Sequence, residues 1–287
     1  MQGSGKRLER SLVVFTWDGG SLDHIDMDAE PAFDILLFDF TGRAACPGND
    51  WPFLSQKTEC KGDVLRVASR YLRQDPFLPD YVALFDHDIK VSISDINRLL
   101  DIAQREKLDS FAPALTHDSH YSYPRFLQKP GSTLRRTAWV EVMMPFYRTE
   151  LFLAASEFYE NSITAYGVDN FVMPLFQKIL GMENVAIIDR VTVTHMHPVS
   201  SGSRICSNGL TPYRERMIAR RDCLAWLDAN RPDLVGTSWY YETFAPLDGP
   251  ARFWLLRLAW PWHLLRRFLP DMLPSRRRSR HCSTKPI

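Results

Sequence analysis

Short apolar runs and amphipathic segments alternate along the first 200 residues. The apolar runs are rich in β-branched and aromatic residues and are bounded by Gly, Asp or Pro, as strands are; they cover residues 11–17, 33–40, 80–86, 109–115, 137–148 and 185–198. The amphipathic segments repeat apolar residues at helical spacing; they cover residues 62–72, 149–160 and 168–181, and another begins at Ser92, where Ser92 and Asp95 have capping-box spacing. This alternation predicts an α/β fold whose mostly parallel sheet is flanked by helices.

The pattern changes after residue 200. Gly and Ser crowd residues 198–209, which predicts a mobile loop, and a mostly helical extension that includes residues 213–230 follows. The last segment is rich in Trp, Leu and Arg. We therefore expect an α/β domain over residues 1–200, a loop and helical extension over 201–250, and a basic aromatic tail over 251–287.

The charge of the chain is unevenly distributed. The formal net charge is +1, but residues 251–287 hold nine Arg or Lys and one acid, which leaves 26 basic and 33 acidic residues in the other 250. A mildly acidic body with a basic tail argues against nucleic acid as the ligand of the body. The hydrophobic content of 45% is that of a globular protein with a sizeable core.

The cysteines and the hydropathy indicate the cellular compartment of the protein. Five scattered cysteines form no Cys-x-x-Cys pair, which indicates neither a zinc site nor a disulfide framework. The N-terminal apolar run is too short for a signal peptide, and no window approaches the roughly 20 apolar residues of a membrane-spanning helix. We expect a cytoplasmic protein with reduced thiols.

Two acids follow the apolar run of residues 81–85. Asp86 and Asp88 are two positions apart, so their side chains share a face if the backbone is extended. In an open α/β sheet, ligands bind at the carboxyl ends of the strands, where these acids lie. Two neighbouring carboxylates repel unless a cation or a proton intervenes, and a divalent cation with oxygen ligands keeps open positions for substrate phosphates. The pair therefore predicts a site that binds a divalent metal and, through the metal, a diphosphate.

Other phosphate-handling and hydrolytic motifs are absent or incomplete. Residues 36–43 (LLFDFTGR) approach a phosphatase loop, but Thr41 stands where the second acid belongs, so Asp39 is not expected to be a nucleophile. No GxxxxGK[ST], GxGxxG or nucleophile elbow occurs. Phosphate binding is then expected to depend on a metal or on other backbone donors.

The segment FDHD (residues 85–88) resembles the Asp-x-Asp motif of the GT-A glycosyltransferases, which hold the diphosphate of a nucleotide sugar through Mn²⁺ or Mg²⁺. Further segments, in the same order, are similar to a family of unknown function related to those enzymes: residues 55–72, 139–150 (WVEVMMPFYRTE), 166–170 (YGVDN) and 188–199 (IDRVTVTHMHPV). The resemblance covers roughly residues 11–200. It implies a GT-A-like catalytic domain that transfers a sugar, as a hexosyltransferase in polysaccharide biosynthesis, from a nucleotide-diphosphate donor to a glycan acceptor.

The resemblance also implies a metal site. Asp88 would bind Mn²⁺ or Mg²⁺, and Asp86 would share the metal or bind the ribose. His195 would complete the site as a neutral imidazole, with His197 as the alternate because it shares the strand face. The metal would stabilise the charge that develops on the departing nucleoside diphosphate.

The remaining roles concern the sugars. Asp169 would accept the proton of the acceptor hydroxyl in an inverting reaction, or orient the acceptor in a retaining one. Glu141 and Trp139, expected on the same strand face, would contact the donor or acceptor sugar. Lys61 would meet a phosphate or the base. The segment YGVDN lacks the second aromatic residue of the related family, which indicates a different acceptor subsite.

Each candidate also has a structural interpretation that the sequence leaves open. The two acids could be solvated loop residues, Asp169 a helix cap, and Lys61 a surface lysine; the histidines could lie on an edge strand, and Glu141 could pair with Arg136 or Arg148. Two rival functions remain as well. One is a metal-dependent phosphohydrolase or nuclease that uses Asp86, Asp88 and His195, and the other is a catalytically silent binding protein on the same fold.

The basic tail has two interpretations. The aromatic residues and arginines of residues 251–281 suit docking on an anionic membrane surface, as a peripheral contact at its inner face. Packing of the tail on the catalytic domain suits them equally. Membrane docking would favour a lipid-linked or cell-envelope glycan as the acceptor. A tail deletion that leaves the membrane partition of the protein unchanged would exclude docking.

Overall fold

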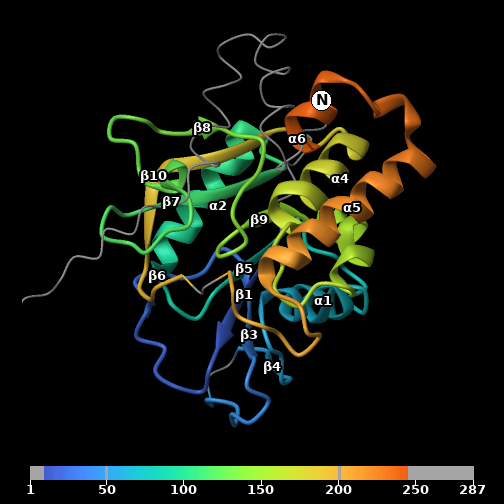
Figure 1. Cartoon of the computed structure of the whole chain (residues 1–287). Coiled ribbons are helices and arrows are strands. Elements are labelled where there is room, and N and C mark those ends of the chain that lie inside the picture. Colours follow the sequence, from blue (N-terminus) through green and yellow to red (C-terminus); the bar gives the residue numbers. More distant parts are fainter. Residues whose placement is uncertain (1–9, 49–50, 200–201, 245–287) are drawn as a thin grey trace, which may run out of the picture.

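The structure is a computed structural model that describes residues 10–48, 51–199 and 202–244 (Figure 1). The expected basic tail, residues 251–287, lies outside the described residues.

The described chain contains one mixed sheet with the order β2-β6-β10-β7-β9-β5-β1-β3-β4, and β8 pairs with β10 beside this path. The strands are β1 (Ser11–Trp17), β2 (Ile25–Asp26), β3 (Asp34–Asp39), β4 (Phe53–Ser55), β5 (Tyr81–Phe85), β6 (Ile89–Ser92), β7 (Ser110–Leu115), β8 (Arg135–Arg136), β9 (Phe146–Arg148) and β10 (Val185–His195). The central strands β1, β3 and β5 are parallel, as are β7 and β10, and β9 lies antiparallel between β5 and β7. The predicted mostly parallel sheet is confirmed.

Strand direction decides where polar residues gather. Because β5 and β7 both run antiparallel to β9, the strands β1, β3, β5, β7 and β10 all point the same way. Their carboxyl ends therefore face one edge of the sheet. Asp86 follows β5, and β10 ends at His195, which is paired with Ile89 of β6. The turn at Asp86–Ile89, closed by a hydrogen bond from the Ile89 N–H to the Asp86 carbonyl (3.1 Å), brings these two strand ends together.

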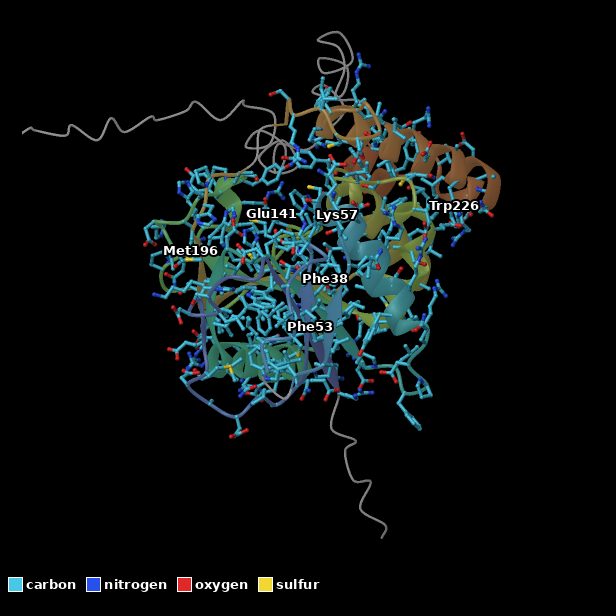
Figure 2. All side chains as sticks on the ribbon, turned by 90° about the horizontal axis from the view of Figure 1, so that it is seen from below. Phe38, Phe53, Lys57, Glu141, Met196 and Trp226 are labelled. Carbon is cyan, nitrogen blue, oxygen red and sulfur yellow. The ribbon has the colours of Figure 1, made fainter. Side chains whose placement is uncertain are left out.

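Helices cover both faces of the sheet. They are α1 (Lys61–Leu72), α2 (Ile93–Glu106), α3 (Thr149–Ala154), α4 (Met173–Leu180), α5 (Pro212–Asn230) and α6 (Ser238–Phe244), with short 3₁₀ turns η1 (Pro124–Phe126), η2 (Ala155–Tyr159) and η4 (Pro232–Leu234) and a π-helical turn η3 (Val168–Val172). One apolar cluster joins the sheet to α2, and a second joins its other face to α1, α3, α4 and α5. Figure 1 shows α2 on one side and α1, α4 and α5 on the other, and side chains fill the space between the layers (Figure 2).

The expected strand over residues 137–148 is wrong. Only Arg135–Arg136 and Phe146–Arg148 form strands, and the residues between them form an irregular loop. The reason is long-range pairing: the Asp86 N–H donates to the Met143 carbonyl (2.9 Å), and the Leu84 N–H to the Pro145 carbonyl (3.3 Å). Pro145 has no N–H to donate to a ladder, so the apolar run cannot form a regular strand there.

Two predicted helices are also divided. The segment 149–160 changes from α3 to the 3₁₀ turn η2 at Ala155. In the segment 168–181, η3 precedes α4. Pro174 occupies the first turn of α4, where a proline is tolerated because no hydrogen bond within the helix requires its N–H. The helix ends at Gly181, as the sequence predicts.

Replacement of Gly62 by Ala is expected to destabilise the protein by about 1–3 kcal/mol. A Cβ atom at Gly62 would lie 2.3 Å from the Ser162 carbonyl oxygen, and the Gly62 N–H is hydrogen-bonded to the Ile163 carbonyl (2.8 Å), which holds the two segments together. The loss arises although Ala favours a helix more than Gly does. Chemical denaturation of this variant and of Gly202→Ala, where a Cβ would meet no atom within 4 Å, tests the packing; equal stability of the two variants would contradict it.

Candidate active site

Asp86 is held by a buried lysine. Lys61, the first residue of α1, reaches across the end of β5 and places its Nζ atom 2.5 Å from Asp86 Oδ1. The same ammonium donates to the Leu84 carbonyl (3.1 Å). Lys61 is 8% exposed, so the expectation of a surface lysine is wrong. Burial raises the pKa of Asp86, and the charge of Lys61 opposes this rise. The lysine thus binds Asp86 rather than pointing freely at a ligand.

Asp88 and His195 form a second pair. The Nε2 atom of His195 lies 3.0 Å from Asp88 Oδ2, and both residues are buried. The Nδ1 atom of His195 lies 2.8 Å from the His120 carbonyl oxygen, which can only accept a hydrogen bond, so Nδ1 carries a proton. This contact leaves Nε2 directed at the carboxylate. In the neutral ring Nε2 offers a lone pair beside an anionic oxygen, which is the arrangement of an imidazole and a carboxylate that bind a metal together.

The charges of this pair stabilise each other. Burial alone would raise the pKa of Asp88, but the hydrogen bond and charge of His195 outweigh it and lower that pKa. Burial likewise opposes protonation of His195, whereas the hydrogen bond and charge of Asp88 raise its pKa. Without a metal, the proton on Nε2 therefore satisfies Asp88. A divalent cation would replace this proton, so metal binding at the pair competes with protons.

His197 lies at the margin of the pair. Its Nδ1 atom is 3.7 Å from Asp88 Oδ2, and its side chain is 63% exposed. The strand β10 ends at His195, so the expected shared strand face with His197 does not extend beyond the strand. Within the described ranges, no group of three or more His, Cys, Asp or Glu side chains is already assembled to hold a metal ion. A metal held by Asp88 and His195 would take its other ligands from water and from substrate phosphates, as Mg²⁺ commonly does.

Asp169 is a buried carboxyl at the start of η3. Gly167 precedes this turn with φ +98°, a conformation that favours glycine, and the Phe171 N–H bonds back to the Gly167 carbonyl (3.0 Å). Burial raises the pKa of Asp169 to about 7, against the opposing charges of Arg216 and Arg125. A carboxyl with a pKa near 7 is well matched to general base catalysis at neutral pH.

Glu141 projects from the irregular loop after β8. It is 4% exposed, and its Oε2 atom has no hydrogen-bond partner in the structure. Burial raises the pKa of this carboxyl to about 8, and the negative charge of Asp169 contributes to the rise. A hydrogen bond from Ser122 opposes the rise. Glu141 is therefore protonated at neutral pH and can donate a hydrogen bond. An unpartnered buried oxygen in a native protein calls for a ligand or a water.

Glu141→Gln is expected to raise the melting temperature of the metal-free protein above pH 8 more than at pH 5. A carboxyl whose pKa rises from 4.5 to about 8 on folding stabilises the fold while it is protonated, and that contribution is lost as the pH rises through 8. The Gln side chain is neutral at every pH, so the stability of the variant does not fall through ionisation at this position. Melting temperatures of both proteins in EDTA between pH 5 and 9 test this; a difference that does not change with pH would contradict the raised pKa.

Trp139 does not line an open face. Its ring packs against Tyr123 (5.1 Å between centroids) and Phe126 (5.3 Å), and the guanidinium of Arg125 lies 4.8 Å from its ring centroid. It is 7% exposed. The tryptophan therefore supports the loop that carries Glu141, and Arg125 covers it.

Three residues near the site were missed by sequence reasoning. His120 fixes the ring of His195, Ser122 contacts Glu141, and Arg216 acts on Asp169. Each lies in a loop or helix that is remote in sequence from its partner. No local pattern marks them; the only signal was the run of polar residues THDSHYSYP that follows β7.

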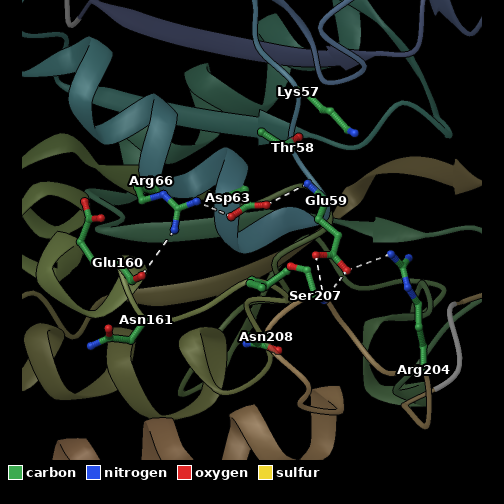
Figure 3. Close-up of a pocket in the computed structure, with 11 residues that line it drawn as sticks. Lys57, Thr58, Glu59, Asp63, Arg66, Glu160, Asn161, Arg204, Ser207 and Asn208 are labelled. Carbon is green, nitrogen blue, oxygen red and sulfur yellow. Dashed lines mark hydrogen bonds and ion pairs between the residues drawn. The ribbon is translucent and has the colours of Figure 1, made fainter.

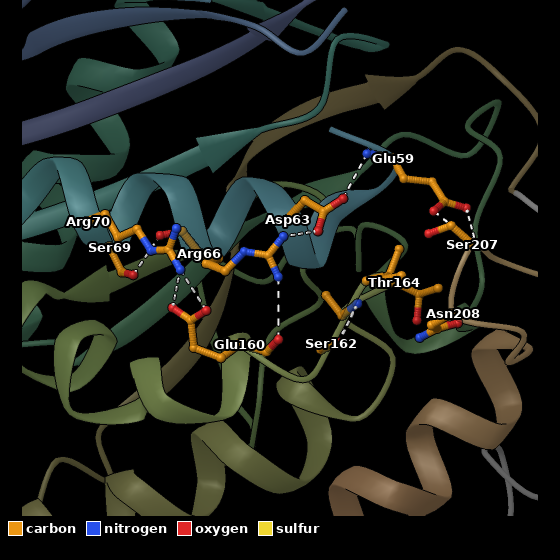
Figure 4. Close-up of polar contacts among 12 residues, drawn as sticks. Glu59, Asp63, Arg66, Ser69, Arg70, Glu160, Ser162, Thr164, Ser207 and Asn208 are labelled. Atoms are coloured by element: carbon orange, nitrogen blue, oxygen red, sulfur yellow. Dashed lines mark hydrogen bonds and ion pairs between the residues drawn. The ribbon is translucent and has the colours of Figure 1, made fainter. Parts of the chain in front are cut away.

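A polar groove of about 1000 Å³ lies beside the start of α1 (Figure 3). Its lining contains no residue of the predicted site. Several of its side chains are already bonded within the groove: Arg66 pairs with Asp63, and Glu59 accepts from Arg204 (3.3 Å) and from the Ser207 N–H (3.1 Å to each carboxylate oxygen). Figure 4 shows the Glu59–Ser207 and Asp63–Arg66 contacts at the start of α1 and, farther along the helix, the contacts of Arg66 and Arg70 with Glu160. The Glu59 contacts hold the loop after β10 against the start of α1. We assign no chemistry to the groove.

Asp39, which the sequence excludes as a nucleophile, anchors a loop. Burial opposes its ionisation, but hydrogen bonds from the hydroxyls of Ser55 (2.6 Å) and Thr41 (2.7 Å) and from the Ala44 N–H (2.9 Å) lower its pKa to about 2. Both carboxylate oxygens are engaged in these bonds.

No helix within the described ranges is both long enough and apolar enough to span a membrane.

Comparisons with known proteins locate the fold. No protein-family model and no curated protein matches the chain. Among solved structures, GalNAc-T7 with UDP, GalNAc and Mn²⁺ is similar at 11% identity and a TM-score of 0.52; the match covers 82% of this chain and 52% of that one, so the chain spans about half of its length. TarS 1–349 from S. aureus, in complex with UDP-GlcNAc, matches at 12% identity over 82% of this chain and 78% of that one, with a TM-score of 0.43. The chain has the GT-A fold that its sequence predicts.

Proposed function

We propose that the protein is a metal-dependent glycosyltransferase that uses a nucleotide-diphosphate sugar as its donor. The observation that carries the proposal is the buried Asp88–His195 pair at the carboxyl edge of the sheet, with His195 Nδ1 fixed by the His120 carbonyl and Nε2 directed at the carboxylate. GalNAc-T7, which shares the fold, was solved with UDP, GalNAc and Mn²⁺. This likeness supports a nucleotide diphosphate and a divalent metal as the ligands that we propose for the site.

The residues present fit a hard or borderline divalent cation such as Mn²⁺ or Mg²⁺. Asp88 and His195 would hold it, with His197 as the alternate, and the unfilled positions suit the two phosphates of a donor. When bound, the metal supplies Lewis-acid stabilisation of the charge on the departing diphosphate. Asp86, neutralised by Lys61, is left to accept a hydrogen bond from the ribose.

The acceptor half of the site rests on two carboxyls in different protonation states. Asp169, with a pKa near 7, takes the proton from the attacking hydroxyl of a glycan. Glu141, with a pKa near 8, stays protonated and donates a hydrogen bond to a sugar oxygen. When the surroundings of two neighbouring acids give them different pKa values, the acid with the lower pKa commonly acts as the base and the other as a proton or hydrogen-bond donor. The charges of the two carboxyls interact, so their titrations are coupled.

The second candidate is a metal-dependent phosphohydrolase. It is favoured by the raised pKa of Asp169, because a base with a pKa near 7 could activate water as well as a sugar hydroxyl. The two reactions break different bonds. A transferase that uses water as a poor acceptor releases a nucleoside diphosphate, whereas a pyrophosphohydrolase releases a nucleoside monophosphate and a sugar phosphate.

Product analysis tests the proposal. The purified protein is incubated with UDP- and GDP-linked hexoses in Mn²⁺, in Mg²⁺ and in EDTA, and the nucleotides are separated chromatographically. We expect metal-dependent release of UDP or GDP. Release of UMP or GMP would establish the hydrolase instead, and intact donors under every condition, together with no nucleotide binding, would indicate a silent fold.

A further inference from the structure

Glu215 is a buried acidic residue that the proposed reaction does not use. It lies in the first turn of α5 and is 3% exposed. Its carboxylate accepts hydrogen bonds from the Thr164 N–H (2.8 Å) and hydroxyl (2.6 Å), from the Ile163 N–H (3.2 Å) and from the Asn208 amide (2.7 Å). Thr164 and Asn208 lie together in Figure 4. One side chain of α5 therefore holds the loop before η3 and the loop after β10 at the same point.

A chain of hydrogen bonds leads from Glu215 towards Asp169. The Thr164 hydroxyl, which donates to Glu215, also accepts from the Tyr166 N–H (3.3 Å). Asp169 follows three residues after Tyr166. The backbone that leads into Asp169 is therefore bonded at its start to the buried carboxylate of α5.

This backbone has a strained conformation. Ala165 is fully buried and has a φ of +63°, in the left-handed region that residues with a Cβ atom rarely adopt. The Val168 N–H donates to the Ala165 carbonyl (3.0 Å) and closes the turn. Gly167, within the turn, packs directly on α5, because a Cβ atom there would lie 2.9 Å from the Ala219 Cβ. Strained backbone persists only where the surrounding structure holds it, and it is commonly found at functional sites.

We propose that Glu215 is a positioning residue for the catalytic base. Through Thr164 it holds the strained turn of residues 165–168 against α5, and it thereby fixes the carboxyl of Asp169 in the place where the acceptor hydroxyl is deprotonated. This inference rests on the proposed function, in which Asp169 accepts that proton. It gives the helical extension a part in the reaction, because α5 supports the base from outside the α/β domain.

Two substitutions at Thr164 separate its hydroxyl from its shape. Valine has the shape of threonine without the hydroxyl, and serine keeps the hydroxyl. We expect Thr164→Val and Glu215→Gln each to lower kcat for nucleoside diphosphate release about 10- to 100-fold, the range for a displaced catalytic group, and Thr164→Ser to keep most of the rate. The KM for the donor should not change, because Asp88 and His195 are held by each other and by His120.

Ser69→Ala is the control for a loss of stability alone. It removes another buried hydroxyl, which donates to the Arg66 carbonyl (2.8 Å) on α1, and it should leave kcat unchanged. Melting temperatures are measured for every variant, and rates are compared at a temperature where all are folded. If Thr164→Val and Glu215→Gln lower only the melting temperature and keep the wild-type kcat, the positioning role is overturned.

Hydrogen exchange separates this inference from the proposed function, because it needs neither metal nor substrate. Amide exchange of residues 165–172 is followed by mass spectrometry in EDTA. We expect faster exchange in Thr164→Val and Glu215→Gln than in the wild-type protein and Ser69→Ala. Unchanged exchange in both variants would refute the support of the turn, whatever the rates, and would leave an active transferase standing. Faster exchange in a protein whose wild type releases no nucleoside diphosphate would refute the transferase and leave Glu215 as the support of this turn.

Discussion

Asp169→Asn is expected to lower the rate of nucleoside diphosphate release from the donor about 10²- to 10⁴-fold, because the proton of the attacking hydroxyl or water then has no base to accept it. In the wild-type protein the rate should rise with pH through about 7, since Asp169 acts only when it is ionised and its pKa is about 7. The variant should lose this rise. Steady-state rates between pH 5.5 and 8.5 measure both effects.

Two controls isolate the base. Asp169→Asn should bind the nucleotide diphosphate with the metal as the wild-type protein does, because the change keeps the size of the side chain. Asp118→Asn removes an exposed carboxylate from the loop after β7 and should keep the full rate. A rate within about tenfold of wild type in Asp169→Asn would show that this residue only orients the acceptor, as in a retaining reaction.

Lys61→Met is expected to destabilise the protein by about 3 kcal/mol at neutral pH, at the lower end of the range for breaking a buried ion pair, because Asp86 is partly exposed. Methionine keeps most of the volume of the lysine side chain, so the loss measures the missing charge rather than a cavity. The destabilisation should shrink as the pH falls, because burial raises the pKa of Asp86 and a protonated carboxyl needs no cation beside it. Urea denaturation at pH 4.5 and 7.5 tests both statements.

The double variant Lys61→Met/Asp86→Asn serves as the control for the ion pair. Removal of both charges leaves no uncompensated carboxylate, so the double variant should be more stable than Lys61→Met alone. If the second substitution destabilises the protein further, Lys61 contributes through packing and through its bond to the Leu84 carbonyl instead of through Asp86.

The parts of the fold that were predicted are those that local patterns encode. An apolar run that ends in acids identifies β5 and places Asp86 at a strand end, and the capping box identifies the start of α2, where the Ser92 hydroxyl accepts from the Asp95 N–H (3.1 Å). Strand direction then follows from the α/β alternation. Because parallel strands end at one edge of the sheet, the proximity of Asp88 to His195 was accessible from sequence.

The parts that were missed depend on contacts between remote segments. The run of residues 137–148 is as apolar as a strand. Its backbone, however, bonds to the end of β5, so most of the run forms an irregular loop, and this loop carries Glu141. Nothing local in the sequence reveals that Lys61 is covered by the end of β5, so a surface position is expected for it. Arg216 gains its place only when α5 packs on Gly167. Tertiary packing decides all three.

The proposed function requires that Asp88 and His195 hold a metal that binds a nucleotide diphosphate. Calorimetric titration of the protein with UDP and with GDP, in Mn²⁺ and in EDTA, tests it most directly when it is repeated on Asp88→Ala. We expect one nucleotide to bind only in the presence of the metal, and we expect Asp88→Ala not to bind it. Binding that persists in EDTA or in Asp88→Ala would show that Asp88 holds no metal needed for the nucleotide.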